Sequence, residues 1–583
     1  MPYTIGELRR SQLITTFSTG AIVDLADYSV MVSGLDAWPT NDLESVKEIR
    51  LQRFLNVSGF RQPRPSESSF GRNKNNRGIP CTRFPRYVFC PSPSCRRLAP
   101  FETFGGGSSG IYCERCRNTG KDDVRLVPAR FVICCRRGHI DDFPWQWWIG
   151  CRCKNPRLMI KSEGASTSLS SILVSCGQCD TEKTMADVFN PESVKGYTCS
   201  GARPWLKDNQ PCDQSIVVLQ RSATSVHFPN TISSLSIPPY SRSAYRRIEQ
   251  LWELALLDSQ PEDHVKTMLK TISEKEELSF DDLWQAYLHR KGVAQIDAVA
   301  DLKEAEYRVL KDPGDFDEED DFVLHSERVP PDFETLIETV VLIEKLRVVT
   351  ALTGFNRIEP NKEQSAALKS PSINWLPATE VLGEGVFMAL NQEAVSNWLQ
   401  ENRKALNERA RSVEARREKL AARNKLIREE LITPEFLLLH TLSHLLIRTL
   451  TINCGYSTSA LQERIYAARS TADQEGMLGL LIFTSASDSE GSLGGLVQQG
   501  KKERLEFTLL DALEQSSWCS SDPLCIESSG QGMDSLNLGS CHSCTLLPET
   551  ACEFMNSFLD RGMVTGTPSN PNLGFFSEIK SWR

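Results

Sequence analysis

Residues 518–552 read WCSSDPLCIESSGQGMDSLNLGSCHSCTLLPETAC, a stretch dense in cysteine. The pair Cys541-x2-Cys544 places two thiolates about one turn apart, where both can reach one tetrahedral zinc ion while a second pair closes the site. Four cysteines fill such a site and one is left over. Buried free thiols are the alternative, and the density favours zinc. The cysteines of the stretch are Cys519, Cys525, Cys541, Cys544 and Cys552.

Length and composition are those of an ordinary globular protein. The 583 residues are enough for roughly three or four domains, and the chain is 40% hydrophobic and 24% charged. It contains no run of about 18 or more apolar residues, the length needed to span a membrane. Its first residues lack the basic start and apolar core of a signal peptide. We therefore expect a cytoplasmic protein without a membrane segment.

The distribution of the 19 cysteines indicates metal sites. Disulfides are rare in the cytoplasm, so this many cysteines need another explanation. Thirteen lie between Cys81 and Cys212, five lie between Cys519 and Cys552, and only Cys454 stands alone. Such clustering is typical of metal ligands rather than of scattered core thiols.

Three groups of ligands are predicted in the N-terminal half. The spacing of the first is typical of a zinc ribbon, in which a hairpin separates two knuckles. The second could form a Cys₃His site, although the single residue between its last two cysteines is awkward. The third has the spacing of a further structural zinc module. The groups are Cys90, Cys95, Cys113 and Cys116; Cys135, His139, Cys151 and Cys153; and Cys176, Cys179, Cys199 and Cys212.

The net charge of −9 hides a basic segment. Between residues 42 and 157 there are 22 Lys and Arg against 10 Asp and Glu, a balance of +12. Such a segment can neutralise phosphates and release counterions, as nucleic-acid binding requires, or it can be a solvated surface. Trp145, Trp147 and Trp148 could stack on bases, but aromatic residues at this spacing are more often core or interface residues.

The order of the predicted elements indicates a mixed α and β, multidomain protein. We predict an N-terminal segment at 1–80, zinc-ribbon-like zinc-binding modules at 81–235, a helical domain at 236–372, and a C-terminal α/β domain at 373–583 with a four-cysteine zinc site. Apolar residues recur at helical spacing at 245–255 and again at 336–346. In the last domain, residues 393–431 predict one long charged helix that is solvated or coiled.

One helix of the last domain carries a second candidate site. Thr433-Pro434-Glu435 predicts its start. His440 and His444 are four residues apart and share a face, as helical metal ligands do. Asp488 and Glu490 stand beside a glycine-rich turn. These four residues could form the site of a metal-dependent hydrolase or nuclease, or they could be a cap and a hydrogen-bonded core network.

Established catalytic motifs are missing from the sequence. Metalloproteases of the helical type place Glu after the first His, and Thr441 is at that position here. There is no Walker A stretch, no Gly-x-Ser-x-Gly and no dinucleotide fingerprint. We therefore expect a non-catalytic protein.

Several motifs resemble a known family. The C-terminal part resembles a domain attached to certain superfamily 2 helicases, in which four cysteines precede an Asn and a Leu-Asp pair, here Asn556 and Leu559-Asp560. The N-terminal part resembles DrmB, a component of the bacterial DISARM anti-phage defence system. The motifs are RSQLITTF at 10–17, GHIDDFPW at 138–145, RPW at 203–205, HTLSH at 440–444, CGY at 454–456, DSEG at 488–491 and GGL at 494–496.

The resemblance implies a zinc-binding subunit that associates with a separate helicase, DrmA, which supplies ATP hydrolysis. It also implies that DNA is bound through the complex, alongside a methyltransferase that marks self DNA. The chain departs from the four-ligand pattern in having one cysteine too many at its C-terminus. Either Cys519 or Cys552 could therefore be the fourth ligand. A scaffold that never touches DNA is the weaker alternative.

Overall fold

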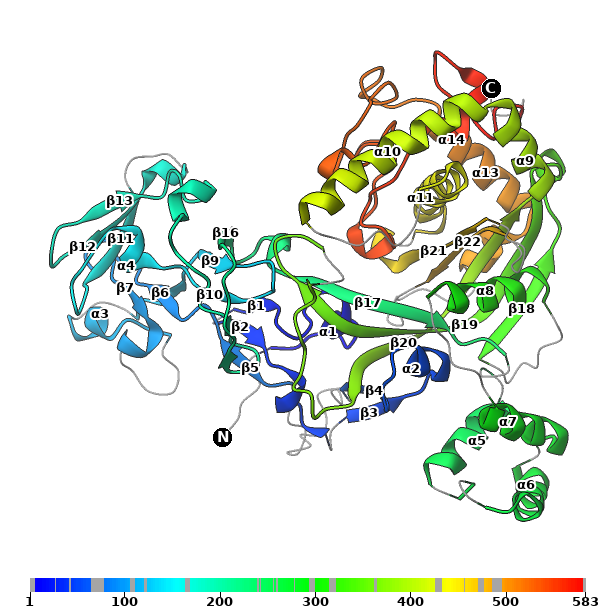
Figure 1. Cartoon of the computed structure of the whole chain (residues 1–583), viewed down its shortest axis with the longest axis horizontal. Coiled ribbons are helices and arrows are strands. Elements are labelled where there is room, and N and C mark those ends of the chain that lie inside the picture. Colours follow the sequence, from blue (N-terminus) through cyan, green and yellow to red (C-terminus); the bar gives the residue numbers. More distant parts are fainter. Residues whose placement is uncertain are drawn as a thin grey trace. The chain divides into compact units, whose positions relative to one another are not determined.

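Figure 1 shows the computed structural model of the chain. It describes residues 6–26, 28–40, 43–63, 78–104, 111–119, 123–162, 168–238, 241, 243–254, 256–257, 260–276, 278–292, 299–313, 321–360, 364–424, 432–455, 457–469, 476–484 and 495–579. The chain forms two compact units, each built from separated segments, whereas the sequence prediction divided it into four consecutive domains. Unit 1 is Met1–Val46, Val57–Ile232 and Thr350–Thr379, and unit 2 is Lys47–Asn56, Ser233–Val349 and Glu380–Arg583.

Most of unit 1 consists of small antiparallel sheets. Its elements, in whole or in part, are α1 Gln12–Thr15, β1 Ile22–Asp24, β2 Ser29–Val32, β3 Leu43–Val46, β4 Gly59–Pro63, β5 Cys81–Arg83, β6 Tyr87–Phe89, β7 Leu98–Pro100, α3 Glu114–Asn118, β8 Val127–Pro128, β9 Phe131–Cys134, β10 Ile140–Asp142, α4 Trp145–Trp148, β11 Leu158–Ser162, β12 Ile172–Cys176, β13 Glu182–Thr184, β14 Ala202–Arg203, β15 Asp208–Asn209, β16 Val217–Gln220 and β17 Phe228–Leu235. Three of the sheets run β7-β6-β8, β10-β9-β16 and β11-β12-β13. Because these strands are short, little regular structure holds the segments between them.

Aromatic side chains fill the core beside β9. The ring of Phe143 packs edge-on against Trp145 at 4.7 Å and against Trp148 at 5.6 Å between ring centroids. Both tryptophans are buried, at 1% and 3% exposure, while Trp147 is 40% exposed and packs on Tyr197. The interpretation of Trp145 and Trp148 as core residues is confirmed.

A buried cation fastens three distant segments of unit 1. The Arg357 guanidinium is almost fully buried and donates to the carbonyls of Gly20 at 2.9 Å, Gly138 at 2.8 Å and Val226 at 2.5 Å. Burial lowers the pKa of Arg357 to about 10. A charge in such a place is tolerated only when its donors are satisfied, so these carbonyls fix how the chain passes around Arg357.

Unit 2 combines a twisted sheet with helices. Its elements, in whole or in part, are α2 Ile49–Phe54, α5 Ser243–Glu253, α6 Glu262–Glu276, α7 Phe280–Gly292, α8 Val299–Lys311, β18 Phe322–Glu327, β19 Ile337–Asn356, β20 Trp375–Leu390, α9 Gln392–Glu401, α10 Arg403–Asn424, α11 Pro434–Cys454, β21 Leu461–Ala468, β22 Met477–Thr484, α12 Gly495–Gly500, α13 Lys502–Ser516 and α14 Gly562–Thr565. The strand order is β19-β20-β22-β21, with β18 also paired to β19. The mixed α and β, multidomain fold predicted from the sequence is thereby confirmed.

The predicted helical domain at 236–372 is only partly helical. Helices α5 to α8 lie between residues 243 and 311, but the apolar residues at 336–346, predicted as a helix, belong to strand β19. Val340 and Leu342 face one apolar core, and Val341 and Ile343 face another. Because both faces of the strand are buried, its apolar residues form an almost continuous run whose spacing mimics that of a helix.

Helix α11 runs through the middle of the C-terminal part of unit 2, with α10, α13, β21 and β22 around it (Figure 1). As predicted, it begins after Thr433, whose side chain accepts a hydrogen bond from the N–H of Phe436. Its buried side chains are mostly apolar, as expected for a helix enclosed by other elements, with His440, Thr441 and His444 among the exceptions. No helix among the described residues is both long and apolar enough to cross a membrane.

The charged stretch at 393–431 is not one solvated helix. It forms α9 and α10, which meet at Asn402, and residues 425–431 lie outside the described part. Leu406, Ala410 and Val413 of α10 are buried in the core around α11. The prediction of a solvated or coiled arm is therefore wrong for α10. The few apolar residues that make its buried face are widely spaced in the sequence among many charged residues, so the sequence does not reveal that face.

Candidate metal centres

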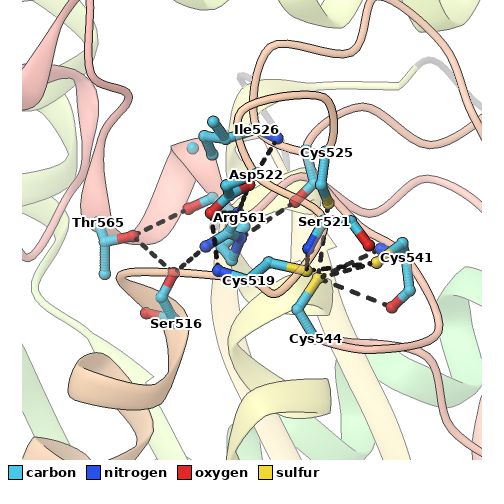
Figure 2. A network of polar contacts seen from close by, with 12 residues as sticks. Ser516, Cys519, Ser521, Asp522, Cys525, Ile526, Cys541, Cys544, Arg561 and Thr565 are labelled. Carbon is cyan, nitrogen blue, oxygen red and sulfur yellow. Dashed lines mark hydrogen bonds and ion pairs between the residues drawn. The ribbon is translucent and has the colours of Figure 1, made fainter.

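Four cysteine thiols converge in the loops that follow α13, as Figure 2 shows. The sulfurs of Cys519 and Cys541 are 3.5 Å apart, and Cys544 lies 3.8 Å from both Cys525 and Cys541. Thiolates about 2.3 Å from a tetrahedral zinc ion would be separated by about 3.8 Å, whereas a disulfide would bring two sulfurs to about 2.05 Å. The spacing therefore fits zinc. Cys519 is the fourth member of this cluster, and Cys552 is not part of it.

The loop of this cluster is held by a buried arginine. Arg561 is fully buried and donates to both carboxylate oxygens of Asp522, at 2.8 and 3.0 Å, and to the carbonyl of Ser516 at 2.8 Å (Figure 2). Asp522 accepts hydrogen bonds from the N–H groups of Cys519 and Ile526, at 2.7 and 3.0 Å. The carboxylate thus links the buried cation to a metal ligand.

At Cys544 the surroundings favour the thiolate form that metals bind. Hydrogen bonding to Cys525, helped by the positive charge of Arg561, lowers the pKa of Cys544 to about 5. Cys544 also accepts a hydrogen bond from the N–H of Cys541 at 3.3 Å. The donor atoms present suit zinc, which prefers sulfur ligands in closed sites.

The first N-terminal cluster has the predicted composition. Cys90 lies 3.6 Å from Cys116, and Cys95 lies 3.9 Å from Cys113, measured between sulfurs. All four are buried. Cys90 follows β6, and Cys116 is in α3, which Cys113 precedes, so a small sheet and one helical turn supply the two knuckles.

The other two N-terminal clusters draw on the predicted residues but combine them differently. The predicted sets are wrong because the strand pairing redistributes the ligands. β11 and β12 form a hairpin in which Leu158 is opposite Cys176. The hairpin brings the 176/179 pair of cysteines next to the 151/153 pair. β16 pairs with β9, with Val217 opposite Cys134, and this brings the last cysteine to the turn after β9. The observed clusters are Cys135, His139, Cys199 and Cys212, and Cys151, Cys153, Cys176 and Cys179.

The distances within these two clusters are close to those in the others. Cys135 lies 3.4 Å from Nδ1 of His139 and 3.9 Å from the sulfur of Cys212, and Cys199 lies 3.6 Å from the same His139 nitrogen. In the second cluster the sulfurs of Cys151 and Cys179 are 3.6 Å apart. The ligands of one cluster, at 151–179, thus lie in the sequence between the two halves of the other cluster, at 135–139 and 199–212.

Cys134 and Cys81 belong to no cluster among the described residues. Burial raises the pKa of Cys134 to about 12, so this side chain is a thiol at neutral pH, whereas Cys81 is exposed. Neither cysteine was predicted to be a ligand.

His440 and His444 lie on one face of α11, as predicted, and both are fully buried. Asp488 and Glu490, their predicted partners, lie outside the described residues. The carboxylate that reaches the histidines is Glu463 of β21, which the sequence reasoning missed. In the sequence Glu463 stands between Gln462 and Arg464, and nothing there marks it as a ligand.

Comparison with known proteins shows the relatives of the chain. Residues 9–228 match the family described as Domain of unknown function (DUF8724), and residues 442–545 match the MrfA Zn-binding domain. The chain is 30% identical over 586 residues to the DISARM protein DrmB of Bacillus paralicheniformis, covering 96% of this chain and 100% of that protein. The chain belongs to the DrmB family. Family membership thus confirms the resemblance seen in the sequence.

In this DrmB family member, the matched regions coincide with the clusters. The MrfA Zn-binding domain match contains Cys519, Cys525, Cys541 and Cys544, and the match at 9–228 contains all three N-terminal clusters. Both the named domain and the sulfur geometry identify zinc as the cofactor. His440 and Cys552 lie outside the zinc-domain match.

Proposed function

We propose that this DrmB family member is a non-catalytic, cytoplasmic zinc-binding subunit that associates with the DISARM helicase DrmA and supports DNA binding in anti-phage defence. The closure of its cysteine clusters carries the proposal. Each offers four protein ligands, whereas a catalytic zinc keeps one position open for water or substrate. Ions held in this way would stabilise a surface and would not activate a substrate.

The DNA-binding part of the proposal rests on the basic segment at 42–157. In unit 1 this segment carries exposed cations around the zinc clusters, among them Arg130, Lys154 and Arg157. Exposed Lys and Arg that contact phosphates give an affinity that falls steeply with salt. A surface stabilised by metal would hold these side chains at fixed positions without a large apolar core.

Co-purification with the DrmA helicase of the same system tests the association. We expect the two proteins to elute together from size exclusion and the mixture to bind DNA more tightly than the helicase alone. Separate elution with unchanged DNA affinity would refute the proposal. Association without any effect on DNA binding would leave only the scaffold interpretation.

A pair of charge-reversal variants tests the DNA surface. Lys154→Glu with Arg157→Glu should reduce the slope of log affinity against log salt by about 2 for duplex DNA, if both side chains contact phosphates. The matched control reverses two exposed cations of α10, Lys404 and Arg411, and should leave the slope unchanged. Equal effects from both pairs would show a general charge effect in place of a surface on unit 1.

The alternative, a metal-dependent hydrolase or nuclease at His440 and His444, is disfavoured by burial. Both side chains are 0% exposed, so a phosphodiester could not reach a metal ion held between them without opening the helix packing. Metal-dependent cleavage that His444→Ala abolishes in a folded protein would restore this alternative.

A further inference from the structure

Four side chains that could ligate a metal meet inside unit 2, away from the cysteine quartets. His440 and His444 are one turn apart on α11, Glu463 is on β21, and Cys552 is in the loop after residues 549–551. One donor atom from each lies within 4.8 Å of all the others. Three separate parts of the chain therefore bring nitrogen, oxygen and sulfur to one place.

The distances between the donor atoms are close to those of a four-coordinate zinc site. Nε2 of His440 is 3.0 Å from Oε1 of Glu463 and 3.2 Å from the sulfur of Cys552, and Nε2 of His444 is 3.5 Å from the same oxygen. Ligands about 2.0–2.3 Å from a tetrahedral zinc ion would lie about 3.3–3.6 Å from one another.

The hydrogen bonding of His444 suits a metal ligand. Its Nδ1 lies 3.0 Å from the carbonyl of Thr545, an acceptor, so Nδ1 carries the hydrogen. In the neutral ring the lone pair of Nε2 then faces the Glu463 carboxylate, and this fully buried nitrogen has no hydrogen-bond partner. A metal ion between the two would turn this repulsive contact into two bonds. A hydrogen bond from the other ring nitrogen to a carbonyl is also the usual way of orienting a ligating histidine.

Cys552 and Glu463 are also held by neighbouring groups. Cys552 accepts hydrogen bonds from the N–H groups of Phe554 and Asn556, at 3.2 and 3.3 Å, and these orient its sulfur. Glu463 accepts from the hydroxyl of Ser443 and from the N–H of Glu553. A thiolate and a carboxylate together balance the two charges of zinc, with both histidines neutral.

We propose that His440, His444, Glu463 and Cys552 bind a further zinc ion, which fastens α11 to β21 and to the C-terminal loops. Two imidazoles, one carboxylate and one thiolate are a ligand set that suits zinc. The site is closed and buried, so the ion has a structural role. This assignment also gives a place to the cysteine that the C-terminal quartet leaves over.

Metal analysis of the purified full-length protein tests the proposal. We expect Cys552→Ala and Glu463→Gln each to contain one equivalent of zinc less than the wild type, by mass spectrometry of the metal. The matched control is Cys134→Ala, which removes a buried cysteine that belongs to no cluster and should leave the zinc content unchanged. Zinc content equal to wild type in both ligand variants would overturn the proposal.

A second measurement on the wild type covers variants that fail to fold. Anomalous diffraction at the zinc edge from wild-type crystals should place a peak between the two histidines, separate from the peak at the Cys519 cluster. A peak at the cysteine cluster with none at His440 and His444 would refute the site. Neither measurement involves the helicase or DNA, so its failure would be distinct from failure of the proposed function.

Discussion

Replacing Arg561 by leucine would test how the C-terminal cysteine cluster is held. The buried guanidinium donates two hydrogen bonds to Asp522, which accepts one from the N–H of the zinc ligand Cys519 at 2.7 Å. Loss of the cation would leave the carboxylate without its charged partner. It would also release the turn that positions Cys519.

The structure gives the size of both effects. Breaking a buried ion pair by removing one partner costs about 3–5 kcal/mol. The Asp522 side chain is 24% exposed and keeps two backbone N–H donors, so we expect the lower end, about 3 kcal/mol of unfolding free energy. Removing a group that orients a metal ligand weakens zinc binding by about 10–100-fold.

A competition titration against a chromophoric chelator measures the zinc affinity, and thermal unfolding of the loaded protein measures the stability. Arg448→Leu is the matched control, because Arg448 also reaches this loop but donates to the carbonyls of Ser543 and Leu546, at 3.1 and 3.4 Å. If Arg561→Leu binds zinc as tightly as Arg448→Leu does, the positioning role of the ion pair is refuted.

Unit 1 offers three more tests. Chelation of zinc from the full chain should open residues 81–220 to limited proteolysis, because metal binding there supplies folding free energy; protection that persists without zinc would contradict this. Arg357→Met leaves three buried carbonyls without their donor and should cost about 2–4 kcal/mol, seen as a lower urea midpoint; an unchanged midpoint would be contrary evidence. Burial raises the pKa of Asp142 from 3.8 in the unfolded chain to about 6. The folded state then binds this proton more tightly, so the contribution of Asp142 to stability is full below about pH 4 and is lost as pH rises through 6, by at most about 3 kcal/mol. Asp142→Asn should reduce this change of the unfolding free energy with pH. Urea titrations at pH 4 and 7 measure it, and an equal change in the wild type and the variant would exclude the effect.

The sequence predicts which cysteines are metal ligands better than it predicts which of them share a cluster. Local spacing was enough for Cys90, Cys95, Cys113 and Cys116, since each knuckle is a single turn of chain. Local spacing did not predict the ligand set where a β-hairpin lies between the ligands. Cys176 lies near Cys151 only because β11 pairs with β12. No pattern in the sequence indicates that the ligands of one zinc site lie between the two halves of another.

The same limit explains the errors in secondary structure. Residues 336–346 were predicted as a helix because burial on both faces of β19 removes the alternation that identifies a strand. Glu463 was missed because it stands between Gln462 and Arg464 in the sequence, and only the packing of His440 and His444 of α11 against it distinguishes it from them. Spacing within one element can be read from the sequence, whereas contacts between elements depend on the fold.

Helix α11 connects these observations. Residues 517–561 contain no long helix or strand, so side chains must hold them in place. On α11, Thr441 accepts from the N–H of Asp560, whose carboxylate pairs with Arg409 of α10 at 2.6 and 2.7 Å. His444 contacts the carbonyl of Thr545, the residue after the zinc ligand Cys544. Polar residues on an otherwise apolar, enclosed helix are costly unless each has a partner. Their presence on α11 follows from its task of holding the C-terminal loops, and with them the thiols that bind zinc.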